Sequence, residues 1–195
     1  MNLILPSMAL AILASALLAN VLKNAKEGEF EYIKDDNTLK VFRLVMPSSV
    51  ALALIVGWFE PWHWFFGKIS DGLFADPWNL WGFVLFISGL TLRWVAILSL
   101  KKAFTVKVTI LKDHKLKSDG VYLWMRHPSY TGMYIYALGL GIALHSFLSI
   151  AILLWGVWYT THNRIPVEEA VLEGHFGQEY RDYKAKTWKL FPLIY

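Results

Sequence analysis

Long, mostly apolar segments dominate this sequence. They cover residues 3–22, 41–59, 78–100 and 129–162. A helix needs about 20 mostly apolar residues to cross a membrane, because each residue adds ~1.5 Å of rise and the hydrocarbon layer is ~30 Å thick. The first three segments match that length. The fourth is too long for one straight span and short for two, so it predicts two helices that turn near His145.

We therefore predict an all-α integral membrane protein with five transmembrane helices, the last two forming a tight hairpin. Four spans are the alternative. The composition agrees, because 56% of the residues are hydrophobic, 17% are charged and the mean hydropathy is +0.40, whereas a soluble domain carries roughly 25% charge. These values exclude a disordered chain, a basic nucleic-acid-binding domain and a disulfide scaffold. Cysteine is absent, which removes thiol nucleophiles and thiolate metal ligands.

The basic residues indicate an orientation in the membrane. The chain has 19 Lys and Arg residues, and all but Lys68 and Arg93 fall on one predicted side of the membrane. They lie in the first loop, in the loop over residues 101–128 and in the C-terminal tail. Cytoplasmic loops are enriched in Lys and Arg. We therefore expect the N-terminus outside, and the long loop and the C-terminus on the cytoplasmic side of the cell inner membrane.

Polar chemistry concentrates in residues 101–130 and 162–173. We interpret residues 1–100 as three transmembrane helices and residues 101–195 as the region that carries the site, within a single structural domain. Walker, G-x-S-x-G and H-E-x-x-H motifs are missing. The histidines 114, 127 and 162, with the glutamates 168 and 169, match no zinc spacing, so we expect no metal.

Arg93 is the charge deepest in a predicted span. Such a residue normally faces a protein or water cavity and marks function. A purely structural pair, or a side chain that reaches the interface, is the alternative. Its neighbours in the sequence do not identify its partner.

Several short motifs occur in a fixed order in the second half of the chain. They are H-x-L-x-x-x-G-V-Y from His114, R-H-P-S-Y from Arg126, R-x-x-x-E-E from Arg164, F-G-x-E-Y-x-x-Y-K from Phe176, and L-F-P from Leu190. This combination resembles the isoprenylcysteine carboxyl methyltransferase family over residues 105–192. The short chain is similar to the prokaryotic members.

The resemblance implies an integral membrane methyltransferase that uses S-adenosylmethionine, with a cytoplasmic cofactor pocket formed by the loop before the fourth helix and by the tail. The implied cofactor contacts are Lys107, His114, Lys115, Leu116, Lys117, Tyr122, His127, Pro128, Ser129, Tyr130 and Glu168. Arg164 is the implied acceptor-binding residue, and Arg164 with Glu168 would form the catalytic centre. Lys117 departs from the small apolar residue usual in the family, so a side-chain or a backbone contact remains open there.

The chemistry of these residues fits methyl transfer. Glu168 suits an ammonium group, and the rings of Tyr122 and Tyr130 suit a sulfonium or an adenine. An acceptor carboxylate is already ionised at neutral pH and needs no general base, and the planar fork of Arg164 matches it. We predict transfer to a carboxylate, or another oxygen, of a lipophilic, prenylcysteine-like acceptor in contact with membrane lipids.

Two other functions remain open at this stage. A phospholipid amine N-methyltransferase would need a proton acceptor, for which His127, Glu169 or Tyr130 could serve. A non-enzymatic transport or sensor protein would need ionisable residues along a path through the membrane, and only Arg93 and His145 qualify.

Overall fold

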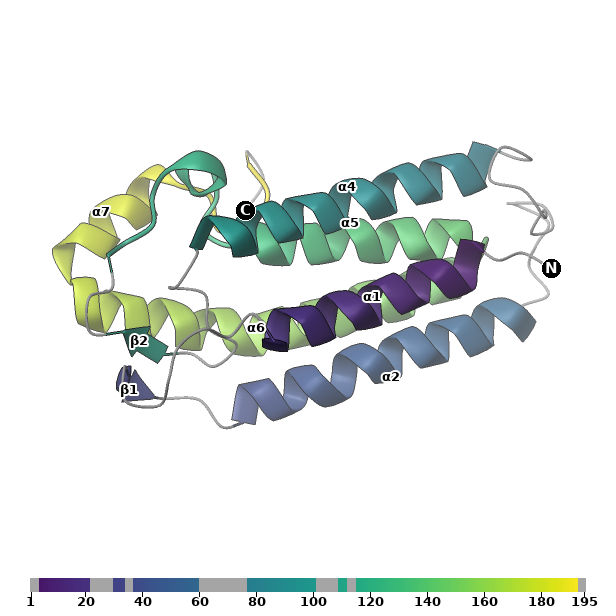
Figure 1. Ribbon diagram of the computed structural model, residues 1–195, viewed down its shortest axis with the longest axis horizontal. Helices are drawn as coiled ribbons and strands as arrows, with labels where there is room; N and C mark the ends of the chain where they lie inside the picture. The colour runs from purple at the N-terminus through teal and green to yellow at the C-terminus, as the bar shows by residue number, and fades with distance from the viewer. Residues whose placement is uncertain are drawn as a thin grey trace.

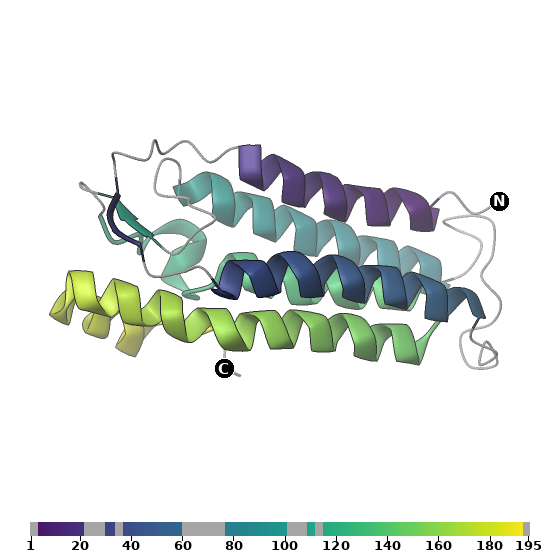
Figure 2. The same ribbon diagram turned by 90° about the horizontal axis from the view of Figure 1, so that it is seen from below.

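The computed structural model is a bundle of long helices that run side by side (Figures 1 and 2). It describes residues 4–21, 30–33, 37–59, 77–100, 109–111 and 115–192. The long helices are α1 (Ile4–Val21), α2 (Asn37–Phe59), α4 (Pro77–Leu100), α5 (Pro128–Ala143) and α6 (Phe147–Phe176). A short 3-10 turn, η3 (Gly120–Leu123), precedes α5, and α7 (Gln178–Lys186) follows α6. The predicted helical architecture is confirmed.

One small sheet departs from the all-α prediction. Strand β1 (Phe30–Ile33) pairs antiparallel with β2 (Thr109–Leu111), so that Phe30 faces Leu111 and Ile33 faces Thr109. Strands of four and three residues are too short to show the alternation by which a strand is recognised in a sequence. The sheet joins the connection between α1 and α2 to the connection that follows α4.

Glycines let α4 and α5 pack backbone against backbone. A Cβ atom on Gly139 would lie 2.5 Å from the backbone nitrogen of Phe86, and one on Gly132 would lie 2.5 Å from the carbonyl oxygen of Gly89. Small residues allow this close approach in membrane proteins, where apolar side chains gain little by leaving lipid. These close contacts hold α4 and α5 in a fixed register.

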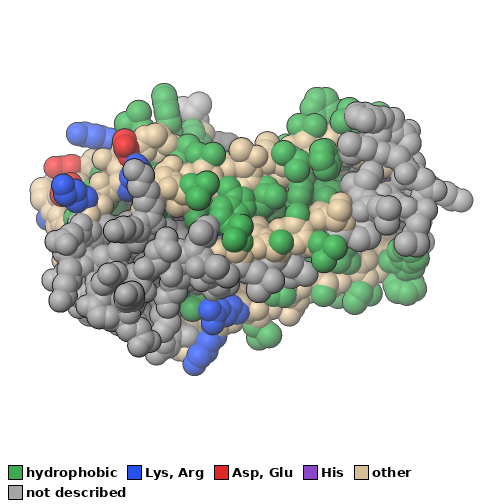
Figure 3. Space-filling view, in the orientation of Figure 1, with side chains coloured by type: hydrophobic (Ala, Val, Ile, Leu, Met, Phe, Trp, Pro, Cys, Tyr) green, Lys and Arg blue, Asp and Glu red, His purple; other side chains and the backbone are tan. Residues whose placement is uncertain are grey.

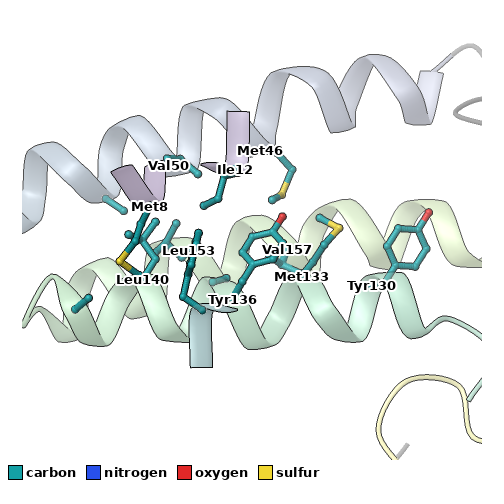
Figure 4. Packing of buried hydrophobic residues seen from close by; sticks show 14 of the residues in the cluster. Met8, Ile12, Met46, Val50, Tyr130, Met133, Tyr136, Leu140, Leu153 and Val157 are labelled. Carbon is teal, nitrogen blue, oxygen red and sulfur yellow. The ribbon is translucent and has the colours of Figure 1, made fainter. Parts of the chain in front are cut away.

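The remaining helices close around a common core. Gly156 of α6 packs on Ser49 of α2, and the Ser149 hydroxyl donates a hydrogen bond to the Ala53 carbonyl oxygen at 2.8 Å. Figure 4 shows the buried side chains in a row between the helices, with Met8 and Ile12 of α1 reaching those of α5 and α6. Tyr130 lies at one end of this row.

The predicted turn near His145 is confirmed. Helix α5 ends at Ala143 and α6 begins at Phe147. His145 adopts a positive φ of 54° that reverses the chain, and its ring Nε2 lies 3.3 Å from Asn79 Oδ1. The Ser146 side chain caps α6 by accepting a hydrogen bond from the Ser149 amide. This buried turn lies at the far end of the bundle from α7 (Figure 1).

The sequence from Pro166 to Tyr180 predicts a helix with Pro166 at its first position, and this predicted start is wrong. Pro166 lies inside α6, which runs unbroken over 30 residues from Phe147 to Phe176. A proline removes one backbone hydrogen bond from a helix interior, but here packing on both sides keeps the helix continuous. At ~1.5 Å per residue α6 is about 45 Å long, longer than a ~30 Å hydrocarbon layer. It therefore extends beyond the bundle towards α7 (Figure 2).

The surface is that of a protein in contact with lipid. Hydrophobic side chains spread along the visible face, and charged side chains gather near the end that carries α7 and near the start of α2 (Figure 3). Among the described helices, α2 and α4 are long and apolar enough to cross a membrane by themselves. The count of five spans stays a prediction.

Candidate active site

The chain enters α5 along an extended segment that pairs with the C-terminal tail. Met125 forms a parallel bridge with Trp188. The Arg126 amide donates to the Trp188 carbonyl oxygen at 2.8 Å, and the His127 amide donates to the Lys189 carbonyl oxygen at 3.2 Å. The structure thus brings the R-H-P-S-Y segment and the end of the tail together.

Arg164, Tyr130 and Glu168 form a compact cluster between α5 and α6. Arg164 Nε donates to Tyr130 Oη and to Glu168 Oε1, both at 2.8 Å, and Tyr130 Oη donates to the same carboxylate oxygen at 2.6 Å. Arg164 Nη1 also reaches Thr38 Oγ1 of α2 at 3.4 Å. Arg164 is only 5% exposed, so its charge is held inside the protein by a carboxylate one helical turn away.

The His127 ring lies between two carboxylates. Its Nδ1 is 3.7 Å from Glu168 Oε2 and its Nε2 is 3.2 Å from Glu169 Oε1. The ring also stacks on Tyr130, with centroids 5.8 Å apart. His127 stands at the position that caps α5, but its side chain makes no capping hydrogen bond. Its ring therefore belongs to the charged cluster.

Arg126 and Glu169 form a buried ion pair beside this cluster, with Arg126 Nε 2.9 Å from Glu169 Oε1. Arg126 Nη1 also donates to the carbonyl oxygens of Lys184 and Thr187, and Lys184 Nζ lies 3.3 Å from Glu169 Oε2. Burial acts to raise the pKa of Glu169, but hydrogen bonds from His127 and Arg126 outweigh it and lower this pKa to about 2.

Tyr122 and Ser129 face α4. Tyr122 Oη donates to the Ala96 carbonyl oxygen at 3.3 Å, and Arg93 Nη1 donates to Ser129 Oγ at 2.9 Å. Tyr183 of α7 donates to the Tyr122 carbonyl oxygen at 2.7 Å. Arg93, whose partner was open in the sequence analysis, therefore reaches a residue of the implied cofactor site.

The other predicted site residues divide into two groups. Lys107 and His114 lie outside the described residues. Lys115, Leu116 and Lys117 lie in the irregular segment before η3, and Lys117 Nζ pairs with Asp119 Oδ1 at 2.6 Å. Pro128 is fully buried at the first position of α5. Within the described ranges no three His, Asp or Glu residues are arranged to hold a metal ion.

Two residues of the network were absent from the predicted site. Arg126 stands in the R-H-P-S-Y motif, and Glu169 was considered only as a proton acceptor or a metal ligand. Their positions inside two matching motifs were the available signal. Their pairing joins residues 43 positions apart, so it depends on the fold of the tail.

An apolar groove runs between α2 and α6, on the same helix pair that the Arg164–Thr38 contact joins. Its volume is about 620 Å³, and it is lined by Leu44, Val45, Ser48, Ser49, Leu52, Ala151, Ile152 and Trp155. Trp155 is nine residues before Arg164 on α6, about 14 Å along the helix axis. The groove can accept an apolar chain.

A bundle of apolar helices with a buried cluster of charged side chains at one end is the architecture of an integral membrane protein. Residues 82–174 match the model of the isoprenylcysteine carboxyl methyltransferase family. Protein-S-isoprenylcysteine O-methyltransferase of Dictyostelium discoideum is 31% identical over 169 residues, covering 84% of this chain and 69% of the relative. Protein-S-isoprenylcysteine O-methyltransferase B of Arabidopsis thaliana is 34% identical, and the match covers 77% of this chain and 77% of the relative.

A solved structure shares the fold as well. The eukaryotic intramembrane Ras methyltransferase ICMT matches with a TM-score of 0.62 and 29% identity, over 80% of this chain and 61% of the solved chain. The chain belongs to the isoprenylcysteine carboxyl methyltransferase family and is a methyltransferase. Membership of this enzyme family rules out the alternative of a non-enzymatic transport or sensor protein.

Proposed function

We propose that this protein transfers the methyl group of S-adenosylmethionine to the carboxylate of a membrane-resident, prenylcysteine-like acceptor. The observation that carries the proposal is the buried cluster of Arg164, Tyr130 and Glu168, which offers a cation and a carboxylate side by side. Relatives named protein-S-isoprenylcysteine O-methyltransferase support the choice of acceptor.

On the donor side, the residues present fit the chemistry of S-adenosylmethionine. Bound here, it would supply an electrophilic methyl group on a sulfonium. Glu168 is 22% exposed on its side chain and would hold the ammonium group by a charge-assisted hydrogen bond. The remaining contacts that the family resemblance implies, from Lys107 to Tyr130, are part of the same proposed donor site. Because the Lys117 side chain pairs with Asp119, a backbone contact is favoured at Lys117.

On the acceptor side, Arg164 would orient the carboxylate. Tyr130 and Glu168 hold its guanidinium through Nε, which fixes the plane of the fork that matches a carboxylate. Orientation of the reacting atoms can lower a barrier by several kcal/mol, and removal of water increases the reactivity of the carboxylate. The apolar tail of the acceptor would lie in the groove between α2 and α6.

The N-methyltransferase alternative needs a group that removes a proton from an ammonium. Glu169, one of the three candidate bases, is held in ion pairs that lower its pKa to about 2. A carboxylate with so low a pKa is a weak base at neutral pH. Glu169 is therefore unsuited to act as that base, whereas carboxyl methylation requires none.

The orientation in the membrane belongs to the same proposal. The site would face the cytoplasm and the N-terminus would lie outside, because 17 of 19 basic residues fall on the side of the site. Residues 1–100 would serve mainly as the membrane scaffold, and residues 101–195 would form the pocket.

The test is methyl transfer by purified protein in detergent or in liposomes. We expect transfer from labelled S-adenosylmethionine to N-acetyl-S-farnesylcysteine and little to phosphatidylethanolamine. Binding of S-adenosylhomocysteine, measured by calorimetry, gives a readout independent of the acceptor. A folded protein that bound neither donor nor product, or that methylated only the amine, would contradict the proposal.

A variant of Arg164 tests the acceptor side separately. Arg164→Ala should reduce turnover by at least about 100-fold, the effect of losing a charged hydrogen-bonding group from a buried site. Binding of S-adenosylhomocysteine should change far less. Arg181→Ala is the matched control, because Arg181 is half exposed on α7 and pairs with Glu173 at 3.6 Å. Near-normal turnover in Arg164→Ala would exclude the assigned role.

A further inference from the structure

Arg93 is a buried cation in the last third of a helix that can cross the membrane. It is 8% exposed in α4, seven residues before the helix ends at Leu100. Among the described residues, its guanidinium donates a hydrogen bond from Nη1 to the Ser129 hydroxyl at 2.9 Å. Burial of a charge without an opposite charge is unfavourable in protein and in lipid, so a neutral hydroxyl alone does not explain this arginine.

The two other arginines with buried side chains, Arg126 and Arg164, each pair with a carboxylate. Arg126 meets Glu169 at 2.9 Å and Arg164 meets Glu168 at 2.8 Å, with arginine side chains 8% and 6% exposed. Among the residues that the structure describes, Arg93 pairs with no carboxylate. A bound anion would complete the same arrangement at Arg93.

The surroundings of Arg93 are already positive. Ser129 stands in the first turn of α5, where the helix dipole favours an anion and disfavours a cation. The position of Arg93 is fixed, because a Cβ atom on Gly132 would lie 2.8 Å from the Arg93 backbone nitrogen. The backbone contact therefore holds a cation at the positive end of a helix.

Arg93 and Glu168 both affect the pKa of Tyr122. Burial, together with the charges of Tyr183 and Glu168, raises the pKa of Tyr122, while Arg93 lowers it. Tyr122 is itself buried and fixed to α4 through Ala96. Ser129, the partner of Arg93, directly precedes Tyr130, which donates to Glu168 Oε1 at 2.6 Å. A cation and a carboxylate are thus joined to neighbouring residues of α5, and these are the two charges that an amino-acid zwitterion requires.

We propose that Arg93 binds the carboxylate of the amino-acid end of S-adenosylmethionine, with Ser129 positioning the guanidinium and Glu168 binding the ammonium. This assignment rests on the proposed function. It gives Arg93 the binding role that its burial requires, and it extends the donor pocket from the tail and α5 to α4.

The experiment compares two ligands that differ only in the carboxylate. They are S-adenosylhomocysteine and its decarboxylated analogue S-adenosyl-3-thiopropylamine, and the measurement is the Kd of each by calorimetry. The unmodified protein should bind the carboxylated ligand about 10- to 100-fold more tightly, as expected for a charged hydrogen bond. Arg93→Gln should bring the two Kd values within about threefold of each other by weakening only the carboxylated ligand.

Arg93→Lys is the matched control, because it keeps a positive charge at the same position. It should retain part of the preference for the carboxylated ligand, whereas a purely structural role of the guanidinium would weaken both ligands alike in Arg93→Lys and Arg93→Gln. Equal affinities in the unmodified protein, which need no variant, would overturn the proposal. So would an unchanged ratio in Arg93→Gln, even with a raised KM for the farnesylcysteine acceptor. Failure to bind either ligand would instead show that the proposed donor is wrong.

Discussion

Glu169 lies where three basic side chains of the site meet. Arg126, His127 and Lys184 all lie within 3.3 Å of its carboxylate. Removal of one partner of a buried ion pair leaves the other charge uncompensated and costs about 3–5 kcal/mol. Glu169→Gln should therefore lower the unfolding temperature measured in detergent. Glu173→Gln is the control, since Glu173 is 36% exposed on its side chain and exposed pairs contribute about 0–1 kcal/mol.

The same carboxylate gives a pH dependence. Its pKa is lowered from 4.5 to about 2, so the folded state favours the ionised form. This stabilisation is complete above pH 4.5 and decreases as the pH falls towards 2. Between pH 5 and pH 3 the unfolding temperature should fall more steeply in the unmodified protein than in Glu169→Gln. Parallel slopes would contradict the assignment.

Neighbouring residues of one helix could be placed from the sequence. Arg164 and Glu168 are four positions apart, and the helical period alone puts them on one face. The Arg126–Glu169 and Arg93–Ser129 contacts join residues 43 and 36 positions apart. No local pattern specifies such pairs, because they depend on how the tail folds back and how α4 packs on α5.

At the scale of elements, the length of α6 organises the site. The sequence predicted a helix that starts at Pro166, yet α6 runs through this proline to Phe176. Packing of Ile165 and Val171, which are 4% and 6% exposed, outweighs the loss of one hydrogen bond at the proline. Local propensity predicted the wrong boundary because it contains no tertiary contribution. As a result a single rigid helix carries Arg164, Glu168 and Glu169.

A substitution at Gly139 tests whether the close packing of α4 on α5 stabilises the protein. Gly139→Ala places a methyl group 2.5 Å from the Phe86 backbone nitrogen, which the two helices can relieve only by moving apart. We expect a destabilisation of about 1–3 kcal/mol, typical of overpacking. Gly174→Ala is the control. A Cβ atom there meets nothing within 4 Å, and replacement of a helical glycine by alanine should stabilise by about 0.5–1 kcal/mol. Equal effects would disprove the packing role.

At the scale of the whole molecule, the bundle has two different ends. One carries α7, the buried ion pairs and the C-terminal tail, and the other carries the turn at His145 (Figure 1). If the proposed function is right, a cytoplasmic methyl donor and an acceptor in the bilayer would have to meet where a polar pocket adjoins lipid. Helix α6 would serve both, because its apolar part borders the groove with α2 and its last turns carry the charges.

The orientation of these ends can be tested without background labelling, because the chain contains no cysteine. Ser118→Cys marks the site end, in the exposed segment before η3, and Phe147→Cys marks the opposite end, where the side chain is 53% exposed. If basic residues orient the protein as proposed, a membrane-impermeant maleimide should label Phe147→Cys in intact spheroplasts. It should label Ser118→Cys only after permeabilisation. The reverse pattern would place the site outside the cell, away from cytoplasmic S-adenosylmethionine, and would contradict the proposed topology.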